Sequence, residues 1–496
     1  MIRIWIALFA LVSASAADLR LIRAAKAGDE AGVRGLLKSV DVNAQQGDGS
    51  TALHFAAYSD NLAIADLLIR AGARVNAAND LGVTPLHVAC TNGSAAMVDR
   101  LLAAKANSNA KLLNGETVLM SCARTGNSHA VKALLVNGAD PKAREPEHGQ
   151  TALMWAAAER HPQVTTMLIE FGADVKARSV RYSQTVVGEQ TQRAGREELN
   201  YDVTRGGSTP LLFAARSGDA ESAKMLLAAG ADPNDSLPDG TSALVLAAHS
   251  GNRDVAIALL HKGADPNDIG IGYSALHAAV LRGDLPLVNA LLAHKADPNI
   301  RMTKATPVRR NSTDYFLLAP SVGSTPYLLA AKFLEPEIMQ ALLVAGADPK
   351  LTMLNGATAL MLAAGMNSGT NENRRGVNTI DYGKIEPESK VLPVVKLAFE
   401  NGAGINAGTL NGDTALHAAV THRYESVIRF LVEHGANVNT RNRAGLTPLA
   451  LAARRNGGER PTASTVAGAG ASGGAIGDEL ESQQVIALLK TLGATN

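Results

Sequence analysis

The sequence of 496 residues has few cysteines, few aromatic residues and almost no net charge. Two cysteines are too few for a disulfide-rich scaffold. An aromatic share of 4% disfavours one large core, because such a core is usually filled partly by aromatic rings. A formal charge of +1 lacks the cationic surplus that neutralises phosphates, so we expect no nucleic-acid partner. The composition instead favours a repeated core of alanine and leucine.

The amino-terminal residues have the pattern of an export signal. Arg3 supplies a positive charge, residues 4–12 are apolar, and the small residues 14–16 precede Ala17 as a cleavage site. A membrane anchor is the alternative, but a spanning helix needs about 20 apolar residues, roughly twice this run. We therefore predict a signal peptide over residues 1–16, cleaved after Ala16. The mature protein is expected to be periplasmic or secreted, with no membrane span after cleavage.

A short phrase opened by Thr or Ser recurs through the rest of the chain with a period of 33 residues. Two copies are Thr51-Ala52-Leu53-His54 and Thr84-Pro85-Leu86-His87. The eleven phrases begin at residues 51, 84, 117, 151, 209, 242, 274, 325, 358, 414 and 447. Three of the intervals between them are much longer than 33 residues, so they contain insertions.

The residue pattern of each 33-residue unit predicts two helices followed by a tight turn. The opening hydroxyl is a helix cap, and Pro is suited to the first helical position. Alanine pairs such as Ala56-Ala57 let a neighbouring helix approach the first helix, and leucine pairs such as Leu67-Leu68 give the second helix an apolar stripe. Glycine at positions such as Gly138 ends that helix in the left-handed conformation. An Asn-Gly or Asp-Gly pair then predicts a hairpin turn before the next unit.

These residues resemble the ankyrin repeat, whose T-P-L-H-x-A-A phrase and 33-residue unit recur here. The resemblance implies an all-α repeat solenoid in which each unit is a helix-turn-helix plus a β-hairpin. It covers nearly all of residues 17–496 as a single array. A half-matching stretch from about Asp18 to Asn43 is similar to an amino-terminal capping repeat. We expect about twelve units including this cap.

Four insertions interrupt the array, at about residues 178–206, 300–322, 365–390 and 456–481. The first two lie in the hairpins, and the last two separate the first helix of a unit from its second. Most insertions are tolerated surface loops, because loop length costs little free energy. The second is the best candidate for a binding element, since Arg and aromatic residues are enriched at interfaces. Its candidate residues are Arg309, Arg310, Tyr315 and Phe316.

The sequence contains no pattern of residues that predicts catalysis or metal binding. Neither H-E-x-x-H nor C-x-x-C occurs, so we expect no metal site and no cofactor. His54, His87, His277 and His417 all occupy the fourth position of the phrase, where the family resemblance implies hydrogen bonds between units. Other units have apolar residues at that position, which argues against a ligand or catalytic role.

Cys90 and Cys122 lie in the first helices of adjacent units, where other units have small residues. The simpler interpretation is two buried small side chains without a bond. The alternative is a disulfide, because an exported protein meets an oxidising environment and stacked small residues approach closely enough.

The resemblance implies a scaffold that binds another protein on the concave face of the array, rather than an enzyme. The alternatives are a self-assembling structural protein of the cell envelope and, less favoured, an enzyme with a site built from the insertions. In the family, contact positions lie seven and eight residues after the opening Thr and at the hairpin tips. Here the helical positions are Tyr58, Arg124, Glu159, Arg216, His249, Arg282, Lys332, Phe333, His422, Arg454 and Arg455. Their basic bias indicates an acidic or mixed partner surface; the partner's identity and the oligomeric state are left open.

Overall fold

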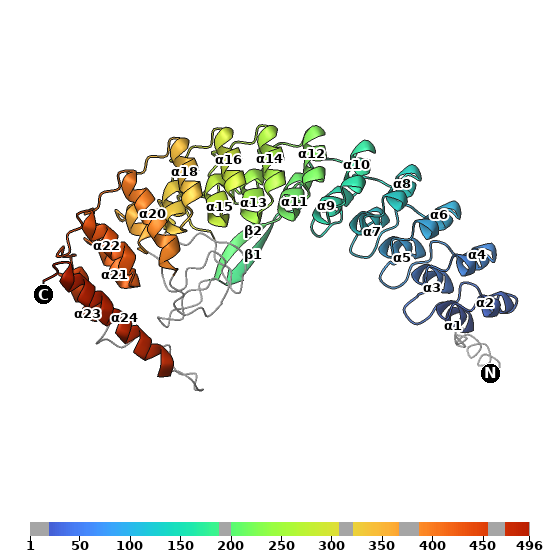
Figure 1. Ribbon diagram of the computed structural model, residues 1–496. Helices are drawn as coiled ribbons and strands as arrows, with labels where there is room; N and C mark the ends of the chain where they lie inside the picture. Colours follow the sequence, from blue (N-terminus) through green and yellow to red (C-terminus); the bar gives the residue numbers. More distant parts are fainter. Residues whose placement is uncertain (1–18, 188–199, 307–320, 367–385, 455–471, 496) are drawn as a thin grey trace, which may run out of the picture. The chain divides into compact units, whose positions relative to one another are not determined.

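The computed structural model describes residues 19–187, 200–306, 321–366, 386–454 and 472–495. These residues form helices α1 to α24 and one two-stranded sheet (Figure 1). The predicted helical solenoid is confirmed. The sheet pairs β1 (Tyr182–Val187) with β2 (Asn200–Arg205) inside the first insertion. We had expected only an enlarged loop there, although Thr185 and the valines that follow it favour strands.

The chain divides into two compact units. Unit 1 comprises residues 1–184, 204–238 and 261–263, and unit 2 comprises residues 185–203, 239–260 and 264–496. Helices α1 to α12 belong to unit 1, and α13 to α24 belong to unit 2 apart from His261. Each unit is described separately below.

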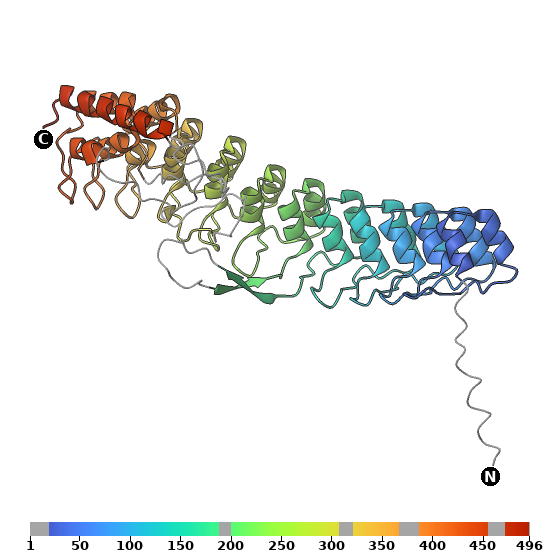
Figure 2. The same cartoon turned by 90° about the horizontal axis from the view of Figure 1, so that it is seen from below.

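The helices alternate along the chain between a first and a second helix of each repeat. The pairs of unit 1 are α1 (Arg20–Lys26) and α2 (Glu30–Leu36), α3 (Ala52–Tyr58) and α4 (Leu62–Arg70), α5 (Pro85–Thr91) and α6 (Ala95–Ala103), α7 (Val118–Thr125) and α8 (Ser128–Val136), α9 (Ala152–Ala158) and α10 (Pro162–Glu170), and α11 (Pro210–Ser217) and α12 (Ala220–Ala228). In Figure 2 the loops that join successive pairs of unit 1 lie along one edge, below the helices.

Unit 2 continues the same alternation. Its pairs are α13 (Ala243–Ser250) and α14 (Arg253–His261), α15 (Ala275–Arg282) and α16 (Leu285–Ala293), α17 (Pro326–Lys332) and α18 (Pro336–Val344), α19 (Ala359–Ala363) and α20 (Glu388–Glu400), α21 (Ala415–His422) and α22 (Glu425–Glu433), and α23 (Pro448–Arg454) and α24 (Ser472–Thr491).

The opening hydroxyl of most phrases accepts a capping hydrogen bond at the start of a first helix, as the sequence predicts. The Thr84 Oγ1 accepts a hydrogen bond from the His87 N–H, with Pro85 as the first helical residue. Several second helices have caps of their own; for example, Asn61 Oδ1 accepts a hydrogen bond from the Ile64 N–H at 3.0 Å. Local sequence therefore fixes where both helices begin.

The core of each unit lies between the helices and is built from small side chains. Ala56 and Ala57 of α3 are fully buried, as are Ala214 and Ala215 of α11. Because a methyl group adds little bulk, adjacent first helices can pack closely, and leucines such as Leu68 fill the space toward the second helices. This arrangement explains how the chain forms a core with so few aromatic rings.

A ladder of asparagines joins consecutive repeats, and the sequence analysis did not identify it. Asn76 Nδ2 donates to the Lys105 carbonyl at 3.3 Å, and Asn76 Oδ1 accepts from the Asn107 N–H at 2.7 Å. Each such residue satisfies backbone groups of the following repeat, so it aligns the two. The same pair of bonds is made by Asn43, Asn109, Asn267, Asn299 and Asn406.

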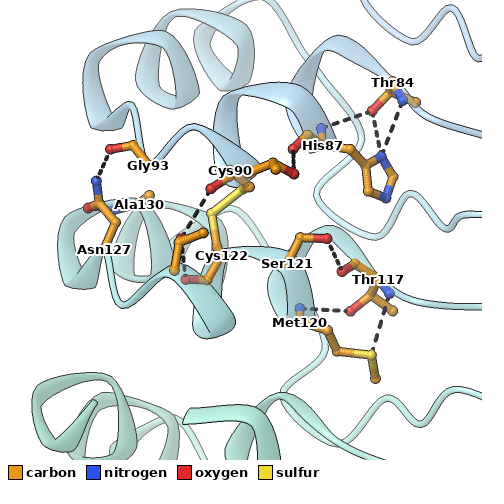
Figure 3. The surroundings of a disulfide bond; sticks show 12 residues. Thr84, His87, Cys90, Gly93, Thr117, Met120, Ser121, Cys122, Asn127 and Ala130 are labelled. Atoms are coloured by element: carbon orange, nitrogen blue, oxygen red, sulfur yellow. Dashed lines mark hydrogen bonds between the residues drawn. A yellow bond between two sulfur atoms is a disulfide. The ribbon is translucent and has the colours of Figure 1, made fainter. Parts of the chain in front are cut away.

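Cys90 and Cys122 form a disulfide between α5 and α7 (Figure 3). The simpler interpretation of two unbonded side chains was therefore wrong. The two first helices stack so closely that the Cα atoms lie 4.6 Å apart, within the range that a disulfide requires. The bond closes a separation of 32 residues, and by limiting the unfolded chain it contributes about 3–4 kcal/mol to stability.

The remaining insertions lie partly outside the described residues. Arg309, Arg310, Tyr315 and Phe316 fall in the undescribed range 307–320, and the predicted signal peptide falls in 1–18. Helix α24 begins at Ser472, nine residues before the expected end of the fourth insertion at residue 481. Among the described residues, no helix combines the length and apolarity needed to cross a bilayer.

Candidate functional site

The candidate site is the surface of the first helices in unit 1. In unit 1 the residue four after the opening Thr is half-buried except for the buried Ser121, and the residues seven and eight after the Thr lie at the helix end. We define the first-helix surface of unit 1 by the side chains at these positions that are large or charged and lie in the described chain. They are Phe55, Tyr58, Arg124, Trp155, Glu159, Phe213 and Arg216.

Arg124 and Trp155 form the most ordered part of the first-helix surface. The Arg124 guanidinium lies 5.1 Å from the centroid of the Trp155 ring, in a cation–π contact from one repeat to the next. It also lies 3.6 Å from the Glu116 carboxylate, which accepts a hydrogen bond from Ser121 Oγ at 2.9 Å. Because these contacts hold both side chains in place, a partner would meet a pre-ordered Arg–Trp pair.

Tyr58 is the most exposed aromatic residue of this surface. Its exposed fraction is 72%, while its carbonyl accepts a hydrogen bond from Asn92 Nδ2 at 2.7 Å. The neighbouring Phe55 is half-buried, with Lys26 Nζ 4.1 Å from its ring centroid. The backbone of Tyr58 thus belongs to the stack, whereas its ring faces solvent.

A row of side chains from each following repeat caps the carbonyl end of the preceding first helix. His161 Nε2 donates to the Arg124 carbonyl at 2.9 Å, and Ser217 Oγ donates to the Ala157 carbonyl at 2.8 Å. In unit 2, Arg282 Nε donates to the His249 carbonyl at 2.6 Å. The last carbonyls of an α-helix generally lie beyond its own N–H donors, and here side chains of the neighbouring repeat donate to them.

The predicted contact residues of unit 1 are mostly exposed, whereas those described in unit 2 are half-buried. Tyr58, Glu159 and Arg216 are exposed, and Arg124 is half-buried with the contacts given above. The other described side chains are half-buried in unit 2: His249, Arg282, Lys332, Phe333 and His422. Arg454 ends α23, and Arg455 lies outside the described residues.

Two of the predicted residues in unit 2 have a structural role. Arg282 donates to His249 as described, and His422 Nε2 donates to the Gly365 carbonyl at 2.9 Å while its ring stacks on Tyr424. Lys332 Nζ donates to Ser321 Oγ at 3.2 Å. Partner binding through these side chains stays a prediction. The sequence did not reveal that Arg282 and His422 also join neighbouring repeats.

The sequence analysis missed the aromatic residues that lie four residues after the opening Thr, because its helical contact residues were only those seven and eight after it. Phe55, Trp155 and Phe213 have half-buried rings beside the predicted contacts. Their signal was available: the sequence has two tryptophans, and Trp5 lies in the predicted signal peptide. Trp155 therefore stands out in a chain with so few aromatic rings.

Three of the four phrase histidines join repeats, as the family resemblance implies, whereas His87 Nε2 is buried without a hydrogen-bond partner. His54 Nδ1 accepts from the Thr51 N–H at 3.1 Å, so the ring proton lies on Nε2, which donates to the Val83 carbonyl at 2.9 Å. His277 and His417 make the corresponding bonds to the Ser324 and Leu446 carbonyls, each at 3.2 Å. These rings are neutral and act as fixed hydrogen-bond bridges.

Burial lowers the pKa of all four histidines. It lowers the pKa of His87 and His277 to about 4, against a smaller opposing effect of the Glu116 and Ser324 backbones. The pKa values of His54 and His417 also fall, for the same reason. Protonation would place a charge in the core and remove the Nδ1 acceptor.

The described residues offer little for catalysis. No three His, Cys, Asp or Glu side chains of this part of the chain gather as metal ligands. The Trp155 Nε1 and Tyr327 Oη are buried without a hydrogen-bond partner, but neither is a nucleophile or base beside a cavity. What the first-helix surface can do chemically is form contacts with another macromolecule.

A family model described as ankyrin repeats (3 copies) matches residues 21–112, 95–179, 194–270, 211–302 and 388–471, together more than half of the chain. An ankyrin repeat-containing protein of Schizosaccharomyces pombe is 39% identical over 56 residues, 11% of this chain and 27% of the relative. Human NF-kappa-B inhibitor alpha is 34% identical over 119 residues, 24% of this chain and 32% of the inhibitor. The chain thus spans about a third or less of these relatives.

A putative ankyrin repeat protein of fowlpox virus is 46% identical over 57 residues, which are 11% of this chain and 17% of the viral protein. Among solved structures, the crystal structure of the human ASB11 ankyrin repeat domain is 27% identical. That match covers 50% of this chain and 98% of the solved one, with a TM-score of 0.40.

The lowered histidine pKa values predict that the protein loses stability in mild acid. The unfolded chain binds protons near pH 6.5, whereas His87 in the folded state does so only near pH 4. The stabilising contribution is therefore complete above pH 6.5 and is lost as the pH falls toward 4. For one such histidine the loss between pH 7 and pH 5 is about 2 kcal/mol.

Urea unfolding of the protein and of His87→Met at pH 7 and pH 5 measures this loss. Met is the matched substitution, because Met120 and Met154 occupy the same phrase position in the next two repeats. We expect the variant to lose less stability between the two pH values than the unsubstituted protein. An equal loss in both proteins would contradict the assignment.

Proposed function

Since this chain belongs to the ankyrin repeat family, we propose that it is a non-enzymatic scaffold that binds another protein through the first-helix surface of unit 1. Repeat arrays of this kind commonly bind proteins, and the matched NF-kappa-B inhibitor is named for a protein that it inhibits. The proposal includes about twelve repeats with α1 and α2 as the amino-terminal cap. The pairing of α1 to α24 along the described chain supports that number.

The observation that carries this proposal is the exposed ring of Tyr58 on the same surface as the ordered Arg124–Trp155 pair. Tyr, Trp and Arg are the residues most enriched where binding energy concentrates. Side chains of neighbouring repeats donate hydrogen bonds to the carbonyls of these helices, including that of Tyr58. These bonds between repeats do not involve the Tyr58 ring, so they do not explain why an aromatic side chain is exposed there. A partner surface that covers the ring would remove its apolar area from water.

We also propose that the protein is exported. The amino-terminal pattern described above is one support, and the Cys90–Cys122 disulfide is an independent one. Disulfides persist mainly in oxidising compartments such as the periplasm and the extracellular space. Both cysteine side chains are fully buried, which suits a structural bond.

Affinity capture from the envelope fraction and culture supernatant of the producing organism tests the binding proposal. The bait is the chain from Ala17, compared with a variant carrying Tyr58→Ala, Glu159→Arg and Arg216→Glu. We expect the variant to lose a specific set of partners while its thermal midpoint barely changes, because exposed substitutions usually cost within about 0.5 kcal/mol.

The matched control carries Phe171→Ala, Glu170→Arg and Lys132→Glu at the end of α10 and on α8, away from the first helices. All three positions are exposed. The control should capture the same partners as the unsubstituted chain. If the first-helix variant also captures them all, the proposed surface is wrong.

Mass spectrometry of the protein recovered from its native host tests the export proposal. We expect an amino terminus at Ala17 and no reaction of Cys90 or Cys122 with a thiol reagent after denaturation without reductant. Full-length protein that begins at Met1, with two reactive thiols, would contradict export.

A further inference from the structure

The loop ends between the first repeats of unit 1 expose leucines beside carboxylates. Leu81 and Leu113 expose 66% and 77% of their surface, although loop ends of this kind are usually polar. Asp48, Asp80 and Glu147 lie at the ends of the same row of loops and are exposed. We call these five residues the fingertip surface.

Backbone hydrogen bonds hold successive fingertips together. The Asp80 N–H donates to the Asp48 carbonyl at 2.9 Å, and the Leu113 N–H donates to the Leu81 carbonyl at 3.1 Å. Gly82 has a φ of 79°, and a Cβ there would lie 2.9 Å from the Leu113 nitrogen. Only glycine allows this close approach, so the loops are in contact and the two leucines keep a fixed spacing.

The fingertip surface is acidic as well as apolar. Asp48 accepts a hydrogen bond from the Ser50 N–H at 2.9 Å, which holds its carboxylate in place. Lys111, an exposed cation of the third loop, pairs with Thr117 at the base of that loop and does not lie at its end. Arg144, in the fourth loop, donates to the carbonyls of Gly149 and Arg178.

We propose that the fingertip surface binds a segment of the partner protein in which Lys or Arg side chains flank apolar side chains. The apolar side chains would cover Leu81 and Leu113, and the cations would pair with Asp48, Asp80 and Glu147. Isolated exposed leucines are ordinary, but an adjacent pair on a rigid edge marks a contact site, and the surrounding carboxylates select the charge of its partner. This proposal rests on the proposed scaffold function and names the chemistry of its partner.

Unit 2 contains a matched pair of fingertip leucines without the carboxylates. Leu354 and Leu410 are exposed by 70% and 61%, and the Leu410 N–H donates to the Asn355 carbonyl at 2.8 Å. Asn411 and Arg443 follow at the next loop ends and are joined by the same kind of bond. These loops therefore control for exposed leucine alone.

Fluorescence anisotropy with synthetic peptides tests the proposal on the intact chain from Ala17. The probe is a labelled peptide of alternating Lys and Leu pairs, compared with one in which Glu replaces Lys and one in which Ser replaces Leu. We expect the Lys/Leu peptide to bind at least about tenfold more tightly than either, and binding to weaken as salt increases.

Two fingertip variants localise the binding. Leu81→Ala with Leu113→Ala removes the apolar contact, and Asp48→Asn with Asp80→Asn removes the charge; Ala444 and Asn114 show that these loops accept both residues. Each variant should bind the Lys/Leu peptide about tenfold more weakly than the unsubstituted chain does. Leu354→Ala with Leu410→Ala should leave the affinity for this peptide unchanged. Equal binding of the Glu/Leu peptide, or an equal loss in the unit 2 control, would overturn the proposal.

The same variants separate this proposal from the scaffold function. If the fingertip variants capture the same partners as the unsubstituted chain while the first-helix variant loses them, the fingertip proposal fails and the scaffold function stands. If both sets of variants lose the same partners, and those partners contain segments with Lys or Arg beside apolar residues, both proposals are supported.

Discussion

The structure depends on the close approach of adjacent first helices, which alanine makes possible. Ala56, Ala57, Ala214 and Ala215 are fully buried because no larger side chain separates the helices. Once helices are this close, polar groups of one repeat reach the backbone of the next. The His54 bond to Val83, the Asn76 bonds to the following repeat and the capping bond from His161 to Arg124 all follow from that distance. The Cys90–Cys122 disulfide requires the same close approach and links two adjacent first helices covalently.

These bonds decide which side chains remain available for a partner. Arg282 and His422 lie at positions that the family resemblance associates with binding, yet both donate to the carbonyl end of the preceding first helix. Tyr58 contributes its backbone to the stack and leaves its ring in solvent. Arg124 is intermediate, since its carbonyl accepts the hydrogen bond from His161 while its guanidinium contacts Trp155. A shared sequence position therefore does not imply a shared role.

The periodic features of the fold could be predicted from the sequence, because each repeat carries its own caps, alanine pair and glycine turn. Most features that depend on two repeats at once could not, although the family resemblance implied the histidine bonds between units and the disulfide was one of two alternatives. The disulfide and the asparagine ladder become evident only when the distance between neighbours is known. The strands β1 and β2 interrupt the period, so the repeat gave no guide to them. Trp155 could have been noticed because tryptophan is rare in this sequence, but its half-buried position and its contact with Arg124 required the structure.

Hydrogen–deuterium exchange of the chain from Ala17, alone and with a captured partner, tests the central claim most directly. The account predicts that the partner slows exchange at the ends of α3, α7 and α9 and in the loops that carry Leu81 and Leu113, while α4, α8 and α10 exchange as before. Protection confined to α4, α8 and α10 would show that the partner binds the opposite side of the repeats, and would contradict the account.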